Sequence, residues 1–166
     1  MEQAIAKILI MLALAGGTPV APHDRETSCL ALNIYHEARG QSIAGQIAVG
    51  QVTLNRLRDK RFPGTVCEVI TQGPHRPSWK GTGEMIPVRH RCHFSWYCDG
   101  KSDKIRQPRT YQKIFELSLI LMNQDMIDIT SEATHYHAYY VEPSWARTKT
   151  RTTKIEDHIF YKWERR

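Results

Sequence analysis

The sequence lacks the common motifs for nucleotide, zinc-protease and serine-hydrolase chemistry. GxGxxG, the P-loop, HExxH and GxSxG are all absent from its 166 residues, which disfavours those three classes of protein. No internal repeat and no low-complexity run occurs. The apolar stretch over residues 4–15, which Lys7 interrupts, is shorter than the roughly 20 apolar residues that span a bilayer. The length suits one domain with a real core.

The N-terminal stretch nevertheless has features of a targeting segment. Ala13-Leu14-Ala15 before Gly16 resembles the small-residue rule for signal cleavage. A cleaved signal, a retained signal-anchor and a buried terminal helix are the three alternatives. We favour export, which divides the chain into a signal or signal-anchor-like segment over 1–21 and a folded domain over 22–166.

The charge balance points to an acidic partner. The formal net charge is +6 and the pI is about 9.3, which suits nucleic acid, an anionic envelope polymer or a membrane surface. The basic residues are scattered, with only a modest concentration in the C-terminal third. We therefore do not expect specific nucleic-acid recognition.

Hydrophobic periodicity and capping residues predict a series of helices followed by a strand-like tail. The predicted helices end near Glu37, run from Ser42 to about Asp59, from Thr65 through Ile70, and from Pro108 to about Asn123. Asp24 or Thr27 would cap the first of them. Residues 133–141 and 159–163 alternate like strands, with a turn at Pro143, and 73–91 are predicted to be a long loop.

Glu37 is the residue that points most directly to chemistry. It follows Ile34 by three residues and Leu30 by seven, so it belongs to or borders the apolar stripe of its helix. Desolvation there raises the pKa of a carboxyl group, which can then stay protonated near neutral pH and donate a proton. The alternative is a helix-end glutamate that pairs with Arg39 or is hydrated by solvent.

Histidines, aromatic residues and a thiol supply the other candidates. His135 and His137 would share one face of a strand, and with His158 they could hold a metal, although satisfied histidines that line a core or a site are favoured. Cys92 beside His93 is a weak thiol-nucleophile pair. Several aromatic residues, together with Ser95 and Asn55, could line a groove for sugars or simply form an aromatic core: Phe94, Trp96, Tyr97, Tyr136, Tyr139, Tyr140 and Trp145.

A set of short blocks, in a fixed order over roughly residues 28–163, carries a family resemblance. The blocks are Ile34-Tyr35-His36-Glu37-Ala38-Arg39-Gly40, Gly45-Gln46-Ile47-Ala48-Val49, Val52-Thr53-Leu54-Asn55-Arg56, Phe62-Pro63-Gly64-Thr65-Val66-Cys67, Cys92-His93-Phe94-Ser95-Trp96, Thr134-His135-Tyr136-His137, Val141-Glu142-Pro143-Ser144-Trp145 and His158-Ile159-Phe160-Tyr161. Each block is weak alone, but the ordered set resembles the SleB-like cell wall hydrolases, which are named for a spore cortex-lytic enzyme and include phage lysins.

The resemblance implies a lysozyme-like (transglycosylase-like) single domain of the α+β class, mainly α with a small β element. It implies that Glu37 is the catalytic general acid and base of a peptidoglycan lytic transglycosylase. Such an enzyme cleaves the β-1,4 bond between N-acetylmuramic acid and N-acetylglucosamine and leaves a 1,6-anhydro product. It needs no cofactor and no metal. Five residues are predicted to contact the glycan strand: Phe94, Ser95, Trp96, Tyr136 and Trp145.

Two alternatives to transglycosylation stay open. A lysozyme-type muramidase would hydrolyse the same bond with a second carboxylate, for which Glu68, Glu84 and Asp99 are candidates. A non-catalytic envelope-binding module would not cleave it at all. The chain also departs from the family pattern twice. Gln41 stands where the family often has Glu, and Glu156 stands where it often has Gly.

Peptidoglycan as substrate implies that the protein works in the periplasm or cell wall. It would arrive there through its own N-terminal segment, which could also contact the membrane, or through a phage holin. In an exported protein the four cysteines would form two disulfides, with three connectivities, whereas in a reducing cytosol they would stay thiols. We predict that Cys67 pairs with Cys92 or Cys98.

Overall fold

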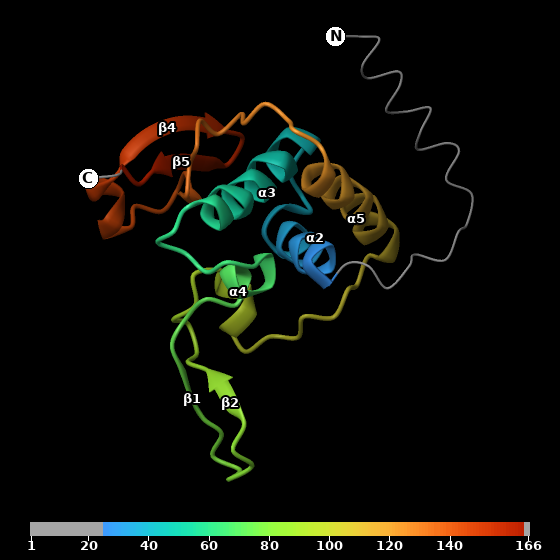
Figure 1. Cartoon of the computed structure of the whole chain (residues 1–166), viewed down its shortest axis with the longest axis vertical. Coiled ribbons are helices and arrows are strands. Elements are labelled where there is room, and N and C mark those ends of the chain that lie inside the picture. Colours follow the sequence, from blue (N-terminus) through green and yellow to red (C-terminus); the bar gives the residue numbers. More distant parts are fainter. Residues whose placement is uncertain (1–24, 165–166) are drawn as a thin grey trace.

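The computed structural model describes residues 25–164, which form a helical body with a sheet on one side (Figure 1). The helices are α2 (Arg25–Ala38), α3 (Ile43–Arg58), α4 (Val66–Ile70) and α5 (Pro108–Asn123). Helix α2 packs against the other three helices. The predicted 1–21 segment and the predicted Asp24 cap lie outside the described residues. No helix within 25–164 has the length and apolar character needed to cross a membrane.

The predicted helix boundaries are confirmed, and capping side chains explain them. Ser42 accepts a hydrogen bond from the Gly45 N–H at the start of α3, and Thr65 accepts one from the Glu68 N–H at the start of α4. Pro108 occupies the first turn of α5, where its missing N–H costs nothing. Thr27 is fully buried within α2 and is not its cap.

The core lies between α2, α3 and α5. Leu30 and Ile34 on α2 and Val49 on α3 are completely buried there. The helices approach closely at Gly50, where a Cβ atom would lie 2.7 Å from Leu121 Cδ1. This packing fixes the direction of α2 and therefore the place at which its last turn ends.

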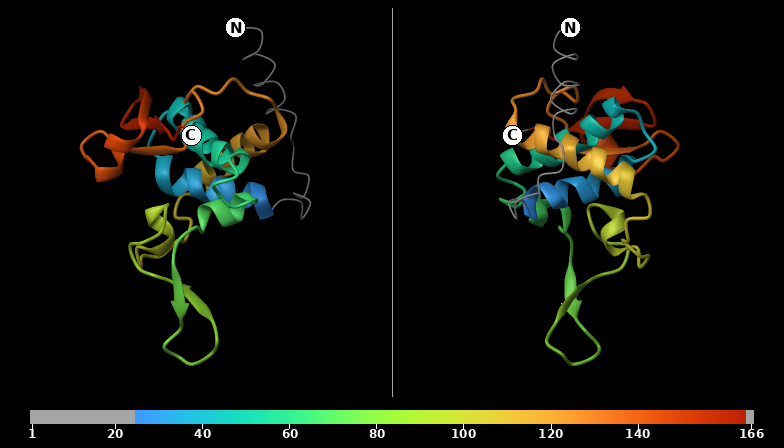
Figure 2. Two further views of the ribbon diagram at one scale, coloured as in Figure 1. Left: turned by 60° about the vertical axis from the view of Figure 1, so that its left-hand side comes forward. Right: turned by 90° about the vertical axis from the view of Figure 1, so that its right-hand side faces the viewer.

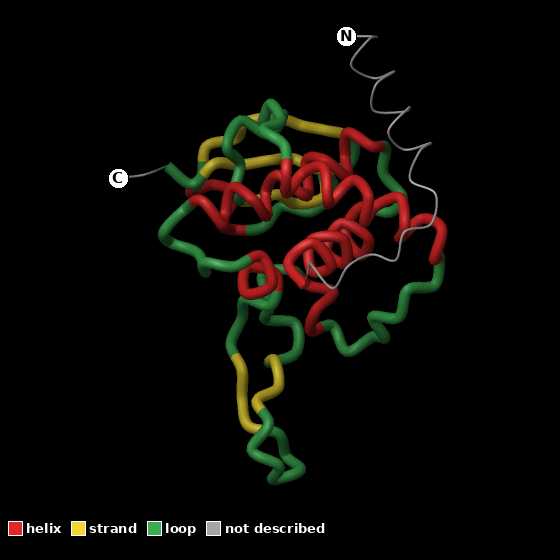
Figure 3. Tube along the Cα trace, turned by 45° about the vertical axis from the view of Figure 1, so that its right-hand side comes forward, coloured by secondary structure: helices red, strands yellow, loops and turns green. Residues whose placement is uncertain are grey.

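A three-stranded antiparallel sheet covers α3 on the side away from α5 (Figures 1 and 3). The order is β3 (His135–Ala138), β5 (His158–Lys162) and β4 (Thr150–Ile155). Fully buried Phe160 on β5 packs in one cluster with Ala48 and Val52 of α3. Tyr136 on β3 is the register partner of Phe160 and packs against the same cluster. The sheet therefore places the Tyr136 ring against the helical body.

The sequence-based prediction missed β4. Strands β3 and β5 lie inside the predicted strand regions, apart from one residue at the start of β5. Thr150–Ile155 is polar apart from Ile155, has no fully buried residue and shows no apolar alternation. Its pairing with β5 identifies it instead. The predicted turn at Pro143 leads into a short 3₁₀ helix, Ser144–Thr148.

The predicted long loop over residues 73–91 contains a β-hairpin. Strands β1 (His75–Pro77) and β2 (Met85–Pro87) pair in antiparallel register and project from the helical body (Figure 2). The prolines and glycines of this segment suggested irregular structure, and the strands are too short to show an alternating pattern.

The predicted pairing of Cys67 with Cys92 or Cys98 is wrong. Cys67 pairs with Cys29, with a Cα–Cα distance of 5.3 Å, and Cys92 pairs with Cys98. The physical reason is the packing of α2 against α4, which brings Cys29 and Cys67 together. The spacing of cysteines along the sequence does not predict which helices pack together.

The first disulfide should stabilise the fold more than the second, because it closes a longer loop in the unfolded chain. The separations are 38 and 6 residues, which correspond to roughly 4 and 2 kcal/mol of loop-closure entropy. We expect Cys29→Ala/Cys67→Ala to lose more free energy of unfolding in urea than Cys92→Ala/Cys98→Ala. Equal losses would contradict this, and non-reducing peptide mass mapping checks the pairing itself.

Candidate active site

Glu37 lies in the last turn of α2, at a cleft of about 460 Å³ between the sheet and the loop that follows the hairpin. The loop wall carries His93–Trp96 and Asp99, and the sheet wall carries Tyr136–Ala138, Tyr140 and His158. His36 of α2 and Arg56 of α3 complete the lining. The cleft is therefore assembled from segments that are far apart in the sequence.

The Glu37 carboxyl is the central titratable group. Burial raises its pKa, and this effect outweighs the hydrogen bond from Tyr136 and the charge of Arg56, which both lower it. The Tyr136 hydroxyl donates to Glu37 Oε2 over 2.8 Å. Burial also raises the pKa of Tyr136 well above its ordinary value, so the phenol stays protonated as a donor. Burial thus favours the protonated Glu37 carboxyl, while Tyr136 and Arg56 stabilise the carboxylate when it forms.

Arg56 is a buried cation beneath the cleft, 5% exposed. Its Nε donates to the Thr134 carbonyl over 2.7 Å, and its guanidinium carbon lies 4.7 Å from the centre of the Phe94 ring. Burial lowers the Arg56 pKa to about 10, so it stays charged at neutral pH. Burial, followed by the charge of Arg56, lowers the pKa of His135 to about 3, which keeps that imidazole neutral.

Trp96 forms a fixed aromatic wall of the cleft. Its ring stacks on His36, with centroids 4.4 Å apart and planes inclined by 16°. The indole N–H donates to Asn33 Oδ1 over 2.9 Å, and Asn33 Nδ2 donates to Thr53 Oγ1 over 3.1 Å. Asn33 and Thr53 are both fully buried. Because the core holds it in this way, the indole is positioned before any ligand arrives.

Five of the six predicted site residues line this cleft: Glu37, Phe94, Ser95, Trp96 and Tyr136. Trp145 does not line it. The Trp145 ring packs 5.2 Å from His135 and 5.7 Å from His137, with Tyr161 also in contact. Phe94 is 2% exposed and packs below Arg56, so it offers little surface for stacking. Asn55 does not line this cleft either. Its Nδ2 donates hydrogen bonds to Asp128, Thr130 and the Ala133 carbonyl.

Sequence reasoning did not identify Arg56 or His36 as site residues. Arg56 follows core residues Ala48 and Val52 at helical spacing, and a charge at such a position was a usable signal. No comparable signal marks His36, because its stack with Trp96 depends on the fold. Among the described residues no group of three or more His, Cys, Asp or Glu is placed to hold a metal.

The two departures from the family pattern lie side by side in space. Gln41 Nε2 donates to Asp157 Oδ2 over 3.1 Å, and the Ser42 N–H donates to Glu156 Oε2 over 2.9 Å. Glu156 has φ = 49°, a left-handed conformation that favours glycine. These bonds tie the turn between α2 and α3 to the turn between β4 and β5, and so hold the Glu37 helix end against the sheet.

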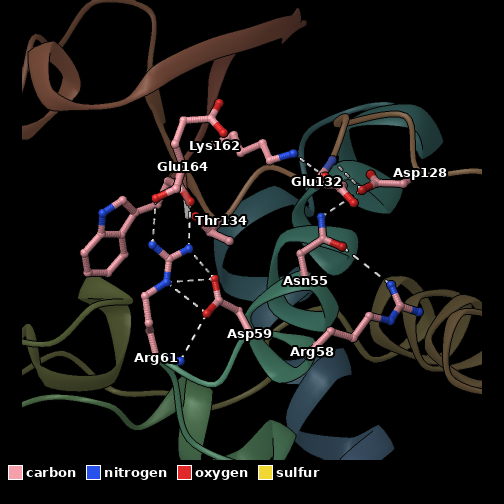
Figure 4. Close-up of a pocket in the computed structure, with 10 residues that line it drawn as sticks. Asn55, Arg58, Asp59, Arg61, Asp128, Glu132, Thr134, Lys162 and Glu164 are labelled. Carbon is pink, nitrogen blue, oxygen red and sulfur yellow. Dashed lines mark hydrogen bonds and ion pairs between the residues drawn. The ribbon is translucent and has the colours of Figure 1, made fainter. Parts of the chain in front are cut away.

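A separate cavity of about 460 Å³ lies beside the C-terminal end of α3 (Figure 4). Four of its charged side chains form two ion pairs: Arg61 with Asp59 at 2.5 Å, and Lys162 with Glu132. Arg61 also donates to the carbonyls of Trp163 and Glu164. These contacts hold the end of β5 against the helical body. Glu37 does not line this cavity.

The family model described as Cell Wall Hydrolase matches residues 40–161, which is most of the chain. The chain belongs to this cell wall hydrolase family, as the ordered blocks predicted. The matched range begins at Gly40, just after Glu37.

Spore cortex-lytic enzymes are among the similar curated proteins. The one from Halalkalibacterium halodurans is 41% identical over 56 residues, 34% of this chain and 17% of that protein. The one from Bacillus subtilis is 40% identical over 58 residues, 35% of this chain and 19% of that protein. The chain thus spans about a fifth of the length of these relatives.

Two solved structures share the fold. The catalytic domain of the germination-specific lytic transglycosylase SleB from Bacillus anthracis is 26% identical, with a TM-score of 0.59 over 87% of this chain and all of that domain. The SleB catalytic domain from Bacillus cereus is also 26% identical, with a TM-score of 0.56 over 89% of this chain and all of that domain. The mainly helical, lysozyme-like fold class is confirmed.

Glu37→Gln should not destabilise the protein at neutral pH. The pKa of Glu37 is raised in the folded state, so its ionisation costs stability as the pH rises above the pKa of the unfolded chain. A neutral amide avoids that cost and still offers Tyr136 an acceptor. We expect urea denaturation to give the variant an equal or higher free energy of unfolding at pH 7, with its relative advantage smaller at pH 4. A clear loss at pH 7 would mean that the carboxylate is structural.

Proposed function

We propose that this chain is a peptidoglycan lytic transglycosylase in which Glu37 is the general acid and base. The observation that carries the proposal is the partly buried Glu37 carboxyl, with its raised pKa and its bond from Tyr136, at the centre of an aromatic-lined cleft. Family membership supports peptidoglycan as the substrate. The likeness to the Bacillus anthracis lytic transglycosylase domain supports the reaction type.

The bond to be cleaved is the β-1,4 link between N-acetylmuramic acid and N-acetylglucosamine. Protonated Glu37 donates to the glycosidic oxygen while the bond to the muramoyl C1 breaks and an oxocarbenium-like centre forms. The Glu37 carboxylate then takes the proton of the muramoyl C6 hydroxyl, whose oxygen attacks C1. The product is a 1,6-anhydro sugar, and no water is consumed.

The surroundings of Glu37 suit both halves of this cycle. Burial favours the neutral acid that the first half needs. The Tyr136 hydroxyl and the charge of Arg56 then stabilise the carboxylate that the first half leaves behind. Because the C6 hydroxyl is tethered to the reacting sugar, its effective concentration is high and no second carboxylate has to position water.

Hydrolysis by a lysozyme-type muramidase is the competing function, and one observation favours it. Of the three candidate second carboxylates only Asp99 lines the cleft with Glu37. Glu68 caps α4 with Thr65, and Glu84 lies on the projecting hairpin. Asp99 Oδ1 accepts the Lys101 N–H over 2.7 Å and its Oδ2 lies 3.9 Å from Lys101 Nζ. We favour transglycosylation because its tethered nucleophile needs no second carboxylate, and because Asp99 Oδ1 already accepts the Lys101 N–H.

The cell wall is the place of action that the family implies, and we propose export as the route. Residues 1–21 would be the exporting segment, which could contact the membrane, and 22–166 the catalytic domain, unless a phage holin releases the protein. The two disulfides support an oxidising compartment. The net charge of +6 suits an anionic envelope polymer.

Glu37→Gln should abolish cleavage without abolishing binding. Loss of the general acid should lower the release of soluble muropeptides by at least about 100-fold. Co-sedimentation with insoluble peptidoglycan should be retained, because the amide keeps the shape of the cleft. Glu116→Gln on α5, whose partner is Gln112, is the matched control and should leave release unchanged.

Each other outcome of this experiment decides against part of the proposal. Release that survives in Glu37→Gln would remove Glu37 from the mechanism. Binding without release by the wild-type protein would favour the non-catalytic envelope-binding module.

Tyr136→Phe should shift the pH dependence of activity to higher pH. The Tyr136 hydrogen bond lowers the Glu37 pKa, so its loss raises that pKa further. Activity requires the protonated acid and falls as the pH rises through this pKa, so the alkaline limb of kcat/KM should move upward. Loss of a hydrogen bond to a charged group should lower kcat about tenfold. Tyr139→Phe, an exposed neighbour, should leave the limb in place. An unmoved or lowered limb in Tyr136→Phe would contradict the assignment.

A further inference from the structure

A second cavity opens beside the catalytic cleft and shares a wall with it. It has a volume of about 370 Å³, and His36, Trp96 and Asp99 line both spaces. Its remaining lining comes from the end of α2 and from the segment before α5: Tyr35, Arg39, Lys101, Ser102, Asp103, Lys104, Arg106 and Gln107. The stacked rings of His36 and Trp96 therefore form part of the wall that the two cavities share.

Positive charge dominates the lining of this second cavity. Four cations face two carboxylates: Arg39, Lys101, Lys104 and Arg106 against Asp99 and Asp103. Lys101 Nζ lies 3.9 Å from Asp99 Oδ2. Lys104 and Arg106 are exposed, and neither forms an ion pair with any residue of the described range 25–164. An anionic group that enters the cavity would therefore meet uncompensated positive charge.

The cavity is held in shape by α2. The Tyr35 hydroxyl accepts hydrogen bonds from the N–H groups of Arg106 and Gln107, each over 3.1 Å. Arg39 Nη1 donates to the Tyr35 carbonyl over 3.2 Å, and its guanidinium lies 5.1 Å from the centre of the Tyr35 ring. Tyr35 itself is 2% exposed. The polypeptide around the cations is thus anchored on the same helix that carries Glu37.

An unpaired polar atom lies in the shared wall. His36 Nε2 is buried and has no hydrogen-bond partner, although buried polar atoms are usually paired. The His36 ring stacks on Trp96 and lines both spaces. A ligand that passes from the cleft into the cavity would run along the stacked rings of His36 and Trp96.

We propose that this cavity binds the carboxylates of the peptidoglycan stem peptide. The inference rests on the proposed function, because a glycan strand that lies across Glu37 must direct the peptide of its muramoyl sugar away from the cleft. The peptide begins at the lactyl group of the reacting sugar and bears several carboxylates. The peptide therefore needs a space that adjoins the cleft and a lining that attracts carboxylates. This cavity adjoins the cleft at Trp96 and carries excess positive charge.

The kinetic test compares intact peptidoglycan with glycan strands from which an amidase has removed the stem peptides. We expect the wild-type protein to have a higher kcat/KM on the intact substrate. In Lys104→Ala/Arg106→Ala the ratio of the two kcat/KM values should fall by about three- to tenfold, mainly through a higher KM. Lys60→Ala/Lys113→Ala removes two exposed cations outside the cavity and should leave the ratio unchanged.

Equal losses on both substrates would overturn the proposal, because the cavity would then hold sugar. An unchanged ratio in Lys104→Ala/Arg106→Ala would overturn it as well.

A binding measurement separates this inference from the proposed function. The probe is a soluble stem tripeptide with free carboxylates, titrated into ¹⁵N-labelled Glu37→Gln protein and followed by NMR. We expect shifts of the Trp96 indole N–H and of the Lys101–Gln107 amides, and at least about threefold weaker binding of the carboxamide form of the same peptide. Equal affinity for both forms, or no shifts at these positions, would refute the cavity assignment. If these shifts are present but the wild-type protein releases no muropeptides, only the proposed transglycosylase activity is refuted.

Discussion

The hydrogen bond from the Tyr136 hydroxyl to Glu37 is the interaction on which the site depends, because it joins the helical body to the sheet. The two residues are 99 positions apart in the sequence, and their side chains meet over 2.8 Å. Burial alone would leave Glu37 with a raised pKa and no support for its ionised form. The phenol supplies most of that support, and the Arg56 charge adds to it, so one carboxyl group can give up a proton and take one back. The rest of the fold brings these two groups together and holds them there.

Three sets of contacts maintain this geometry from different directions. The Arg56 guanidinium holds the start of the β3 segment through the Thr134 carbonyl, and the bonds of Gln41 and Ser42 tie the helix turn to the β4–β5 turn. The bond of Trp96 to buried Asn33 fixes the opposite wall. In consequence the cleft is largely preorganised, and binding of a glycan strand should require little rearrangement around Glu37. The same helix end anchors the cationic cavity, so peptide recognition and proton transfer would share one frame.

Much of the helical frame could be predicted from the sequence, because its signals are local. Ser42, Thr65 and Pro108 mark helix starts through their own capping chemistry, and the spacing of Leu30, Ile34 and Glu37 placed the carboxyl beside the core. The features that the sequence did not reveal depend on contacts between distant segments. Strand β4 has no apolar alternation and exists through its pairing with β5, and the Cys29–Cys67 bond follows from helix packing. Trp145 and Phe94 show the same limit, since sequence marks an aromatic residue but not the direction in which its ring points.

The most direct test of the one-carboxylate account is mass spectrometry of purified peptidoglycan digested by the wild-type protein, without borohydride reduction. The account predicts muropeptides that are lighter by one water than the products of hydrolysis, because the muramoyl C6 oxygen closes onto C1. These 1,6-anhydro ends should also resist later reduction by borohydride. Products with ordinary reducing ends would contradict the account. They would keep Glu37 as the acid but require a residue that activates water, with Asp99 the first to examine.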